Sequence, residues 1–214
     1  MSQYVVIDLE MCKVPHGRRT AAFPWSLELI EIGAVLMNEC FEITDEFKTY
    51  VSPEFGFVDH FIQDLTGICQ KDTQNAPCAQ DALTGFTEWL PEDAVIVSWS
   101  MTDRSQFKKE LSGKAIDLPA LLPYFETWTD CQKMFGDAME SRRQYRLSEA
   151  LVFASIDYSD GAHDALIDAK NTAMLFKQLM TKTFTPNPYM TDADEKPCTY
   201  SAFAELSTLF SMVG

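Results

Sequence analysis

Short apolar runs rich in β-branched residues recur along the chain, which is typical of strands. The first run, at residues 4–7, continues into Asp8-Leu9-Glu10 and predicts a buried strand that carries acid at its carboxyl end. Residues 13–26 have neither a helical nor a strand period and predict a loop. Runs of the same kind predict four further strands, at residues 29–36, 41–51, 94–99 and near 127–130.

Helical spacing of apolar positions appears after Val58. Residues 79–90 place Ala82, Leu83 and Phe86 on one stripe, and Pro91 ends the segment. Five other segments predict helices: 60–64, 104–111, 131–139, 147–154 and 164–180. We expect one main domain at residues 1–182. The remainder, 183–214, predicts a linker (183–197) and a small amphipathic helix docked on the domain (200–212).

Three consecutive strands followed by alternating helices and strands predict a mixed α/β sheet. If the first strand and the strand at 94–99 are parallel neighbours, their carboxyl ends share the edge where open α/β sheets bind ligands. Asp8 and Asp103 would then lie close together.

Composition and charge narrow the possible functions. The chain has 214 residues, 46% of them hydrophobic, and 32 acidic against 17 basic residues give it a formal charge of -15. These values fit a packed globule, and the apolar runs are far shorter than the roughly 20 residues that span a bilayer. A protein that binds nucleic acid through its overall charge is normally basic, so such a role here must depend on a local site.

The amino terminus and the cysteines indicate the compartment. No basic region precedes the short apolar run at residues 4–7, so we expect no secretory signal and a cytoplasmic location. The six cysteines include no C-x-x-C pair, which favours reduced thiols over a zinc site or a disulfide framework.

Asp8 and Glu10 are two residues apart on a predicted strand, so their side chains leave the same face about 6–7 Å apart. Buried carboxylates need a partner, hydrogen bonds or a metal ion. For this pair alone, a hydrated strand end is the simpler explanation. Asp103 alone could equally cap the helix that follows it.

The segment from His163 to Ala173 is more specific. If His163 stays in a loop with Asp164 capping the helix, its imidazole can lie over the site that Asp168 faces. Small residues recur at Ala165, Ala169 and Ala173, as expected of a helix that lies close against a sheet. Taken singly, His163 would more often be an ordinary surface histidine.

Together these features resemble the three motifs of the DEDDh group of 3'-5' exonucleases, which have a ribonuclease H-like fold. The resemblance extends from about Tyr4 to Leu179. The blocks Leu-Ile-Glu-Ile-Gly-Ala at 29–34 and Leu-Thr-Gly-Ile at 65–68 are most similar to the enhanced-RNA-interference and sporulation-inhibitor branch, which favours RNA. The resemblance implies a five-stranded sheet in the order 3-2-1-4-5, flanked by helices.

The resemblance also implies roles for particular residues. His163 would be the general base for the attacking water, and hard carboxylate oxygens suit Mg²⁺ or Mn²⁺. The implied ligands of two such cations are Asp8, Glu10, Asp103 and Asp168. The implied walls of the pocket for the terminal nucleotide are Met11, Thr66, Gly67 and Ile68.

Other substrate contacts are less specific. Phe23 and Trp25 are candidates for stacking on a base, although packing within the protein is as good an explanation. The basic clusters at 13–19 and 142–146 could guide a phosphate backbone or could simply be solvated. Trp99 is better explained as part of the core.

The expected activity is removal of nucleotides from the 3' end of single-stranded or short nucleic acid, RNA favoured, with release of 5'-mononucleotides. One alternative is an exonuclease that trims DNA. Another is a regulatory or binding module that keeps the fold with little catalysis. The sequence leaves open whether the protein is a monomer or a homodimer.

Overall fold

The structure is a computed structural model that describes residues 3–157 and 163–187. Its sheet has the strand order β3-β2-β1-β4-β5, which confirms the expected order. The first three strands are antiparallel, whereas β4 runs parallel to β1 and β5 parallel to β4. The strands are β1 (Tyr4–Lys13), β2 (Leu27–Met37), β3 (Ile43–Tyr50), β4 (Val95–Ser98) and β5 (Thr129–Asp130).

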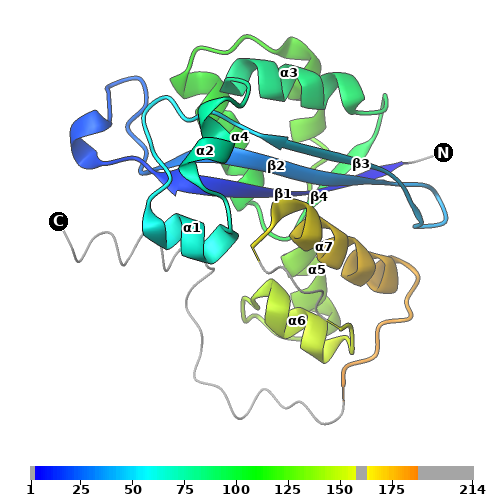
Figure 1. Cartoon of the computed structure of the whole chain (residues 1–214). Helices are drawn as coiled ribbons and strands as arrows, with labels where there is room; N and C mark the ends of the chain where they lie inside the picture. The colour runs from blue at the N-terminus through cyan, green and yellow to red at the C-terminus, as the bar shows by residue number, and fades with distance from the viewer. Residues whose placement is uncertain (1–2, 158–162, 188–214) are drawn as a thin grey trace.

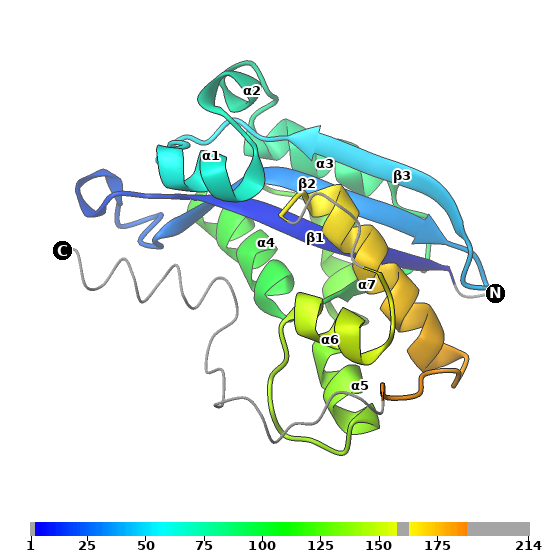
Figure 2. The ribbon, with the colours of Figure 1, turned by 60° about the horizontal axis from the view of Figure 1, so that its bottom comes forward.

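Helices cover both faces of the sheet (Figure 1). Helices α3 and α4 lie on one face, and α5, α6 and α7 lie on the other, where α1 sits beside the start of α7 (Figure 2). The α-helices are α1 (His60–Thr66), α2 (Gln70–Gln74), α3 (Ala79–Trp89), α4 (Thr102–Gly113), α5 (Cys131–Ala138), α6 (Leu147–Phe153) and α7 (Ala165–Met180). Two short 3-10 helices are η1 (His16–Arg18) and η2 (Pro119–Phe125). Within the described ranges, no helix combines the length and apolar character needed to cross a lipid bilayer.

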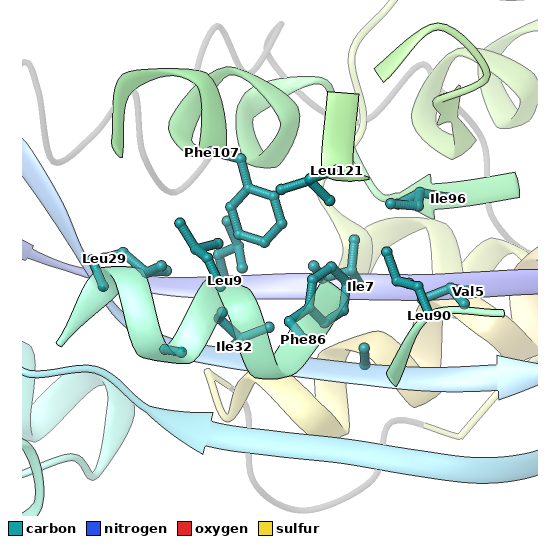
Figure 3. Close-up of a cluster of buried hydrophobic side chains, with 14 of the residues drawn as sticks. Val5, Ile7, Leu9, Leu29, Ile32, Phe86, Leu90, Ile96, Phe107 and Leu121 are labelled. Atoms are coloured by element: carbon teal, nitrogen blue, oxygen red, sulfur yellow. The ribbon is translucent and has the colours of Figure 1, made fainter. Parts of the chain in front are cut away.

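The main core lies between the sheet and α3 and α4 (Figure 3). Ile7 and Leu9 of β1 point into this layer with Phe86 of α3 and Phe107 of α4, and all four are fully buried. Since side chains alternate along a strand, Asp8 and Glu10 point to the opposite face, toward α7 and α1. The apolar positions of β1 therefore fix which face receives the carboxylates.

Several boundaries differ from those predicted. Strand β1 continues to Lys13, so Asp8 and Glu10 lie within it rather than at its end. Helix α4 begins at Thr102 with Met101 as its N-cap, so the alternative in which Asp103 caps the helix is wrong. Helix α2 and both 3-10 helices were not predicted. The predicted linker and helix at 183–214 lie largely outside the described residues.

Buried charges anchor α4 to the sheet. Glu110 of α4 accepts a hydrogen bond from the backbone N–H of Leu29 at 2.9 Å. Lys114 lies 2.6 Å from a carboxylate oxygen of Glu28 and 2.8 Å from one of Glu110. Glu28 in turn accepts hydrogen bonds from backbone N–H groups at 54–56. Both carboxylates are therefore paired, and α4 and the segment before α1 are held to β2.

Gly33 of β2 allows α7 to approach the sheet closely. A Cβ atom at this position would lie 2.2 Å from the backbone N of Leu166 and 2.3 Å from the carbonyl C of Ala165. The first turn of α7 therefore rests directly on the backbone of β2. Because Gly33 pairs with Asp8 on β1, this contact places the start of α7 beside the acidic residues.

We expect Gly33→Ala to lower the free energy of unfolding by about 1–3 kcal/mol, because overpacking forces backbone to move. Gly85→Ala is a matched control, since a Cβ atom at Gly85 of α3 has nothing within 4 Å. The control should stabilise the protein by up to about 1 kcal/mol, the usual gain from glycine to alanine in a helix. Urea denaturation of both variants measures the difference, and unchanged stability of Gly33→Ala would argue against the close contact.

Candidate active site

Three strands present two rows of residues to the face that α7 covers. The pairing of β1 with β2 and of β2 with β3 aligns Asp8, Gly33 and Lys48 in one row. The next row consists of Glu10, Glu31 and Tyr50. Cross-strand neighbours of this kind have Cβ atoms about 4.5–5.5 Å apart. The sheet therefore places acidic side chains side by side at the amino end of α7.

Helix α7 adds Asp168 to these rows, and the loop before the helix adds His163. Asp164 caps the helix by accepting hydrogen bonds from the N–H groups of Leu166 and Ile167, at 3.0 and 3.2 Å. His163 precedes the helix in a left-handed conformation, with φ of 65°. Its backbone N–H donates to the Asp168 carboxylate at 3.2 Å. The structure thus confirms that His163 lies in a loop before a helix capped by Asp164.

Glu10, His163 and Asp168 form the tightest group in the site. One potential ligand atom from each lies within 4.8 Å of the others. Glu10 and Asp168 are buried, and His163 is partly exposed. The imidazole therefore lies beside two carboxylates while keeping access to solvent.

Asp103 reaches the cluster from α4. Strand β4 pairs with β1 only as far as Ile7, which leaves the next part of β1 without a neighbour on that side. The backbone N–H of Leu9 and the side chain of Ser98 act to lower the pKa of the Asp103 carboxyl, although burial outweighs them. Asp103 is 4% exposed. It is therefore buried near the uncovered part of β1, where its charge acts on Asp8.

The electrostatics show that the four carboxylates share one environment. Burial, and then the negative charges of Asp103 and Asp168, raise the pKa of Asp8 well above its usual range. Burial, followed by the charge of Asp168 and that of Glu31, does the same to the pKa of Glu10. Burial raises the pKa of Asp103 to about 7. Without a cation these groups repel one another.

This donor set fits divalent cations of the magnesium type. The groups are hard carboxylate oxygens, and several of them are buried together without enough positive charge nearby to neutralise them. The cluster would hold such ions through Asp8, Glu10, Asp103 and Asp168.

The predicted pocket residues are only partly beside the cluster. Thr66 ends α1, and its hydroxyl donates to the carbonyl of Ile62 and accepts from the N–H of Ile68. Gly67 is exposed, and Ile68 is buried in the same hydrophobic cluster as Cys12 of β1, the strand that carries Glu10. The side chain of Met11 points to the other face, into the main core, which leaves only its backbone for the site.

The other predicted substrate contacts are mostly packed within the protein. Phe23 is fully buried and stacks on Phe55, so it is not a platform for a base. Trp25 is partly buried against Phe23. Trp99 is 9% exposed and belongs to the core, as expected. In the basic clusters, the guanidinium of Arg18 donates to the carbonyl of Gly56, and Arg143 pairs with Glu149.

Sequence reasoning missed Glu31 and Lys48 as parts of the site. Glu31 is directly opposite Glu10, and Lys48 is in the row that contains Asp8. Glu31 lies in a sequence block already singled out, but Lys48 carries no local signal. Only the register of β2 with β3 brings it to α7.

The fold and the site together define a class of protein: a mixed α/β domain with a cluster of carboxylates and a histidine on the sheet face that α7 covers. The chain belongs to the exonuclease family, whose model matches residues 5–176. This agrees with the resemblance to the DEDDh group.

Several known proteins are similar to this chain. ERI1 exoribonuclease 2 of Danio rerio is 29% identical over 178 residues, which cover 72% of this chain and 31% of that protein. The 3'-5' exonuclease Snipper of Drosophila melanogaster is 28% identical over 189 residues, covering 74% and 66%. The 3'-5' exoribonuclease 1 of Homo sapiens is 29% identical over 161 residues, covering 72% and 46%. The chain therefore matches between about a third and two thirds of the length of these relatives.

A solved structure supports the fold assignment. The nuclease domain of 3'hExo, a DEDDh family member bound to rAMP, superimposes with a TM-score of 0.72 and 24% sequence identity. The match covers 88% of this chain and 97% of that domain. The chain therefore has the ribonuclease H-like fold that its motifs imply.

Proposed function

We propose that this protein removes nucleotides from the 3' end of single-stranded or short RNA and releases 5'-mononucleotides. The observation that carries the proposal is the convergence of four carboxylates from β1, α4 and α7, two of which, Glu10 and Asp168, lie beside the imidazole of His163. The names of its relatives support the direction of cleavage and the RNA preference, since two of those above are exoribonucleases and the third is a 3'-5' exonuclease.

The cofactors in this proposal are two divalent cations, Mg²⁺ or Mn²⁺, held by Asp8, Glu10, Asp103 and Asp168. When bound, they would neutralise charge on the attacking and leaving oxygens of an in-line displacement at phosphorus. By holding these cations, the carboxylates would provide a positively charged site for a phosphodiester on a protein whose net charge of -15 would otherwise repel it.

His163 would accept the proton of the attacking water. Its ring lies beside the carboxylates of Glu10 and Asp168 and keeps access to solvent, from which the attacking water would enter. The water oxygen forms a new bond to phosphorus, and the bond from phosphorus to the 3' oxygen of the preceding nucleotide breaks. The terminal nucleotide leaves with a 5'-phosphate, and the 3' oxygen of the shortened chain takes a proton from solvent to become a hydroxyl.

The terminal nucleotide would bind beside the turn that contains Thr66, Gly67 and Ile68. This turn packs near Cys12, two residues beyond Glu10, and a Cβ atom at Gly67 would have nothing within 4 Å. The turn therefore has open space at Gly67. The backbone of Met11 can form part of the same wall.

A chelator-controlled time course on end-labelled oligonucleotides tests the proposal. RNA and DNA of matched sequence are incubated with Mg²⁺, with Mn²⁺ or with excess chelator, and the products are sized. We expect a ladder that shortens from the 3' end, release of 5'-mononucleotides, faster turnover of RNA and no turnover with chelator. Faster turnover of DNA would favour the DNA-trimming alternative. Intact substrate at every length would favour the binding module.

The raised pKa values predict how pH and metal ions affect stability. Because burial raises the pKa of Asp103 from 3.8 to about 7, the folded protein binds more protons than the unfolded chain between these values. Metal-free protein should therefore lose stability as the pH rises through this window. Saturating Mn²⁺ should raise the Tm by at least about 3 °C more at pH 8 than at pH 5.

Scanning calorimetry with and without chelator measures this effect. Sodium chloride at equal ionic strength is the control for simple screening of surface charge. An equal rise in Tm at both pH values would show that protons and Mn²⁺ do not compete for these carboxylates.

A further inference from the structure

Two side chains outside the proposed chemistry converge at the first turn of α7. Glu31 is 1% exposed, and one of its carboxylate oxygens lies 3.0 Å from the Lys48 ammonium. The other oxygen accepts a hydrogen bond from the backbone N–H of Ala165 at 3.2 Å. The same ammonium pairs with the Asp164 carboxylate. Glu31 and Lys48 therefore bind the two residues that directly follow His163.

The conformation of His163 depends on these neighbours. A histidine with φ of 65° is uncommon and persists where the surrounding structure holds it. On one side, its backbone N–H is held by Asp168. On the other, Asp164 and Ala165 are held to β2 and β3 through Glu31 and Lys48. Loss of either attachment would free the backbone on that side of His163.

Other roles for the two side chains fit less well. Both oxygens of Glu31 are engaged, by Lys48 and by Ala165, so it is a poor candidate for a further metal ligand. The Lys48 ammonium contacts two carboxylates, so it is a poor candidate for holding a substrate phosphate. Glu31 also faces Glu10 across the strand pair, an arrangement that is unfavourable without a nearby cation. Lys48 supplies that cation.

We propose that Lys48, acting through Glu31 and Asp164, is a positioning residue for His163. It fixes the start of α7 so that the imidazole stays beside Glu10 and Asp168. This inference rests on the proposed role of His163 as general base.

Three variants test it. Lys48→Met removes the charge and keeps much of the apolar side chain, and Lys48→Arg restores a positive charge. Lys170→Met is a matched control, because Lys170 of α7 also pairs with an acid of β3, Glu46, at 2.8 Å. Lys170 is two residues from Asp168, which is about 200° around the helix, and so points away from the site.

In steady-state kinetics on a short RNA, we expect Lys48→Met to lower kcat about 10- to 100-fold, the scale of loss when a reacting group is misplaced by about 1 Å. KM and the affinity for Mn²⁺ should not change. Lys48→Arg should recover most of the loss, and Lys170→Met should match the natural protein. A rise in KM with unchanged kcat would instead assign Lys48 to substrate binding.

Nuclear magnetic resonance supplies a readout that needs no turnover. The chain has three histidines, so ¹⁵N-histidine labelling gives one set of imidazole signals, from Nδ1 and Nε2, for each of His16, His60 and His163. In metal-free Lys48→Met, the His163 signal should shift or broaden while the other two remain in place. Lys170→Met should leave all three unchanged.

The two readouts separate the failure of this inference from the failure of the proposed function. If the natural protein shows no exonuclease activity but Lys48→Met moves the His163 signal, the positioning contact stands without the chemistry. If Lys48→Met keeps the natural His163 signal and the natural kcat, the inference is wrong. If both methionine variants lose a similar amount of Tm and keep the natural kcat, the inference is also wrong, and the ion pairs of Lys48 only stabilise the fold.

Discussion

Replacement of Asp8 by asparagine is expected to lower the rate of RNA hydrolysis by about 10³-fold or more. Cations at phosphorus supply several kcal/mol of transition-state stabilisation, and Asp8 lies among all the other carboxylates of the cluster. The affinity for Mn²⁺, measured by calorimetry, should fall with the rate. Because Asp8 lies among like charges, the same variant should unfold at a higher temperature than the natural protein when metal is absent.

Asp137→Asn is a suitable control for this variant. Asp137 is 68% exposed and pairs with Lys133 on the surface of α5, where ion pairs contribute little to stability. It should leave turnover, Mn²⁺ affinity and unfolding temperature near those of the natural protein. If Asp8→Asn binds Mn²⁺ as tightly as the natural protein does, Asp8 is not a metal ligand.

Replacement of His163 is expected to lower kcat by about 10²- to 10⁴-fold, the usual contribution of a general base. Affinity for Mn²⁺ should be retained, because the carboxylates rather than the imidazole hold the cations in this account. His163→Ala and His163→Asn should behave alike. Asparagine tolerates the left-handed backbone found at this position, so their agreement would exclude backbone strain as the cause.

The control for His163 is His16→Ala, because His16 is exposed in η1. It should keep natural kinetics. A large loss of Mn²⁺ affinity in both His163 variants would make the imidazole a ligand beside Glu10 and Asp168 rather than a base, since the three lie close enough to share one ion. Near-natural turnover in both His163 variants would show that His163 is not the general base.

Much of the fold follows from local patterns that tertiary packing does not override. The β-branched run at residues 4–7 and the run at 94–99 predicted buried strands, and these became β1 and β4. The alanines at every fourth position predicted a helix close to the sheet, and α7 does lie against Gly33. The loop conformation of His163 followed from the capping preference of Asp164.

The features that were missed depend on register and on contacts between distant segments. The contact of Glu31 and Lys48 with α7 requires the pairing of β2 with β3, which no local pattern specifies. Asp103 was a plausible cap from sequence, whereas in the structure Met101 is the N-cap of α4 and Asp103 is buried beside Asp8. Strand alternation explains why Met11 points away from Asp8 and Glu10 and into the main core. The prediction of Met11 as a wall of the pocket did not take this alternation into account.

Anomalous diffraction from crystals grown with Mn²⁺ tests the shared metal site most directly. We expect two peaks in one pocket, bounded by the carboxylates of Asp8, Glu10, Asp103 and Asp168, with the His163 ring close by but not bonded to either ion. Mn²⁺ peaks only elsewhere on the acidic surface, with this pocket empty at saturating metal, would contradict it.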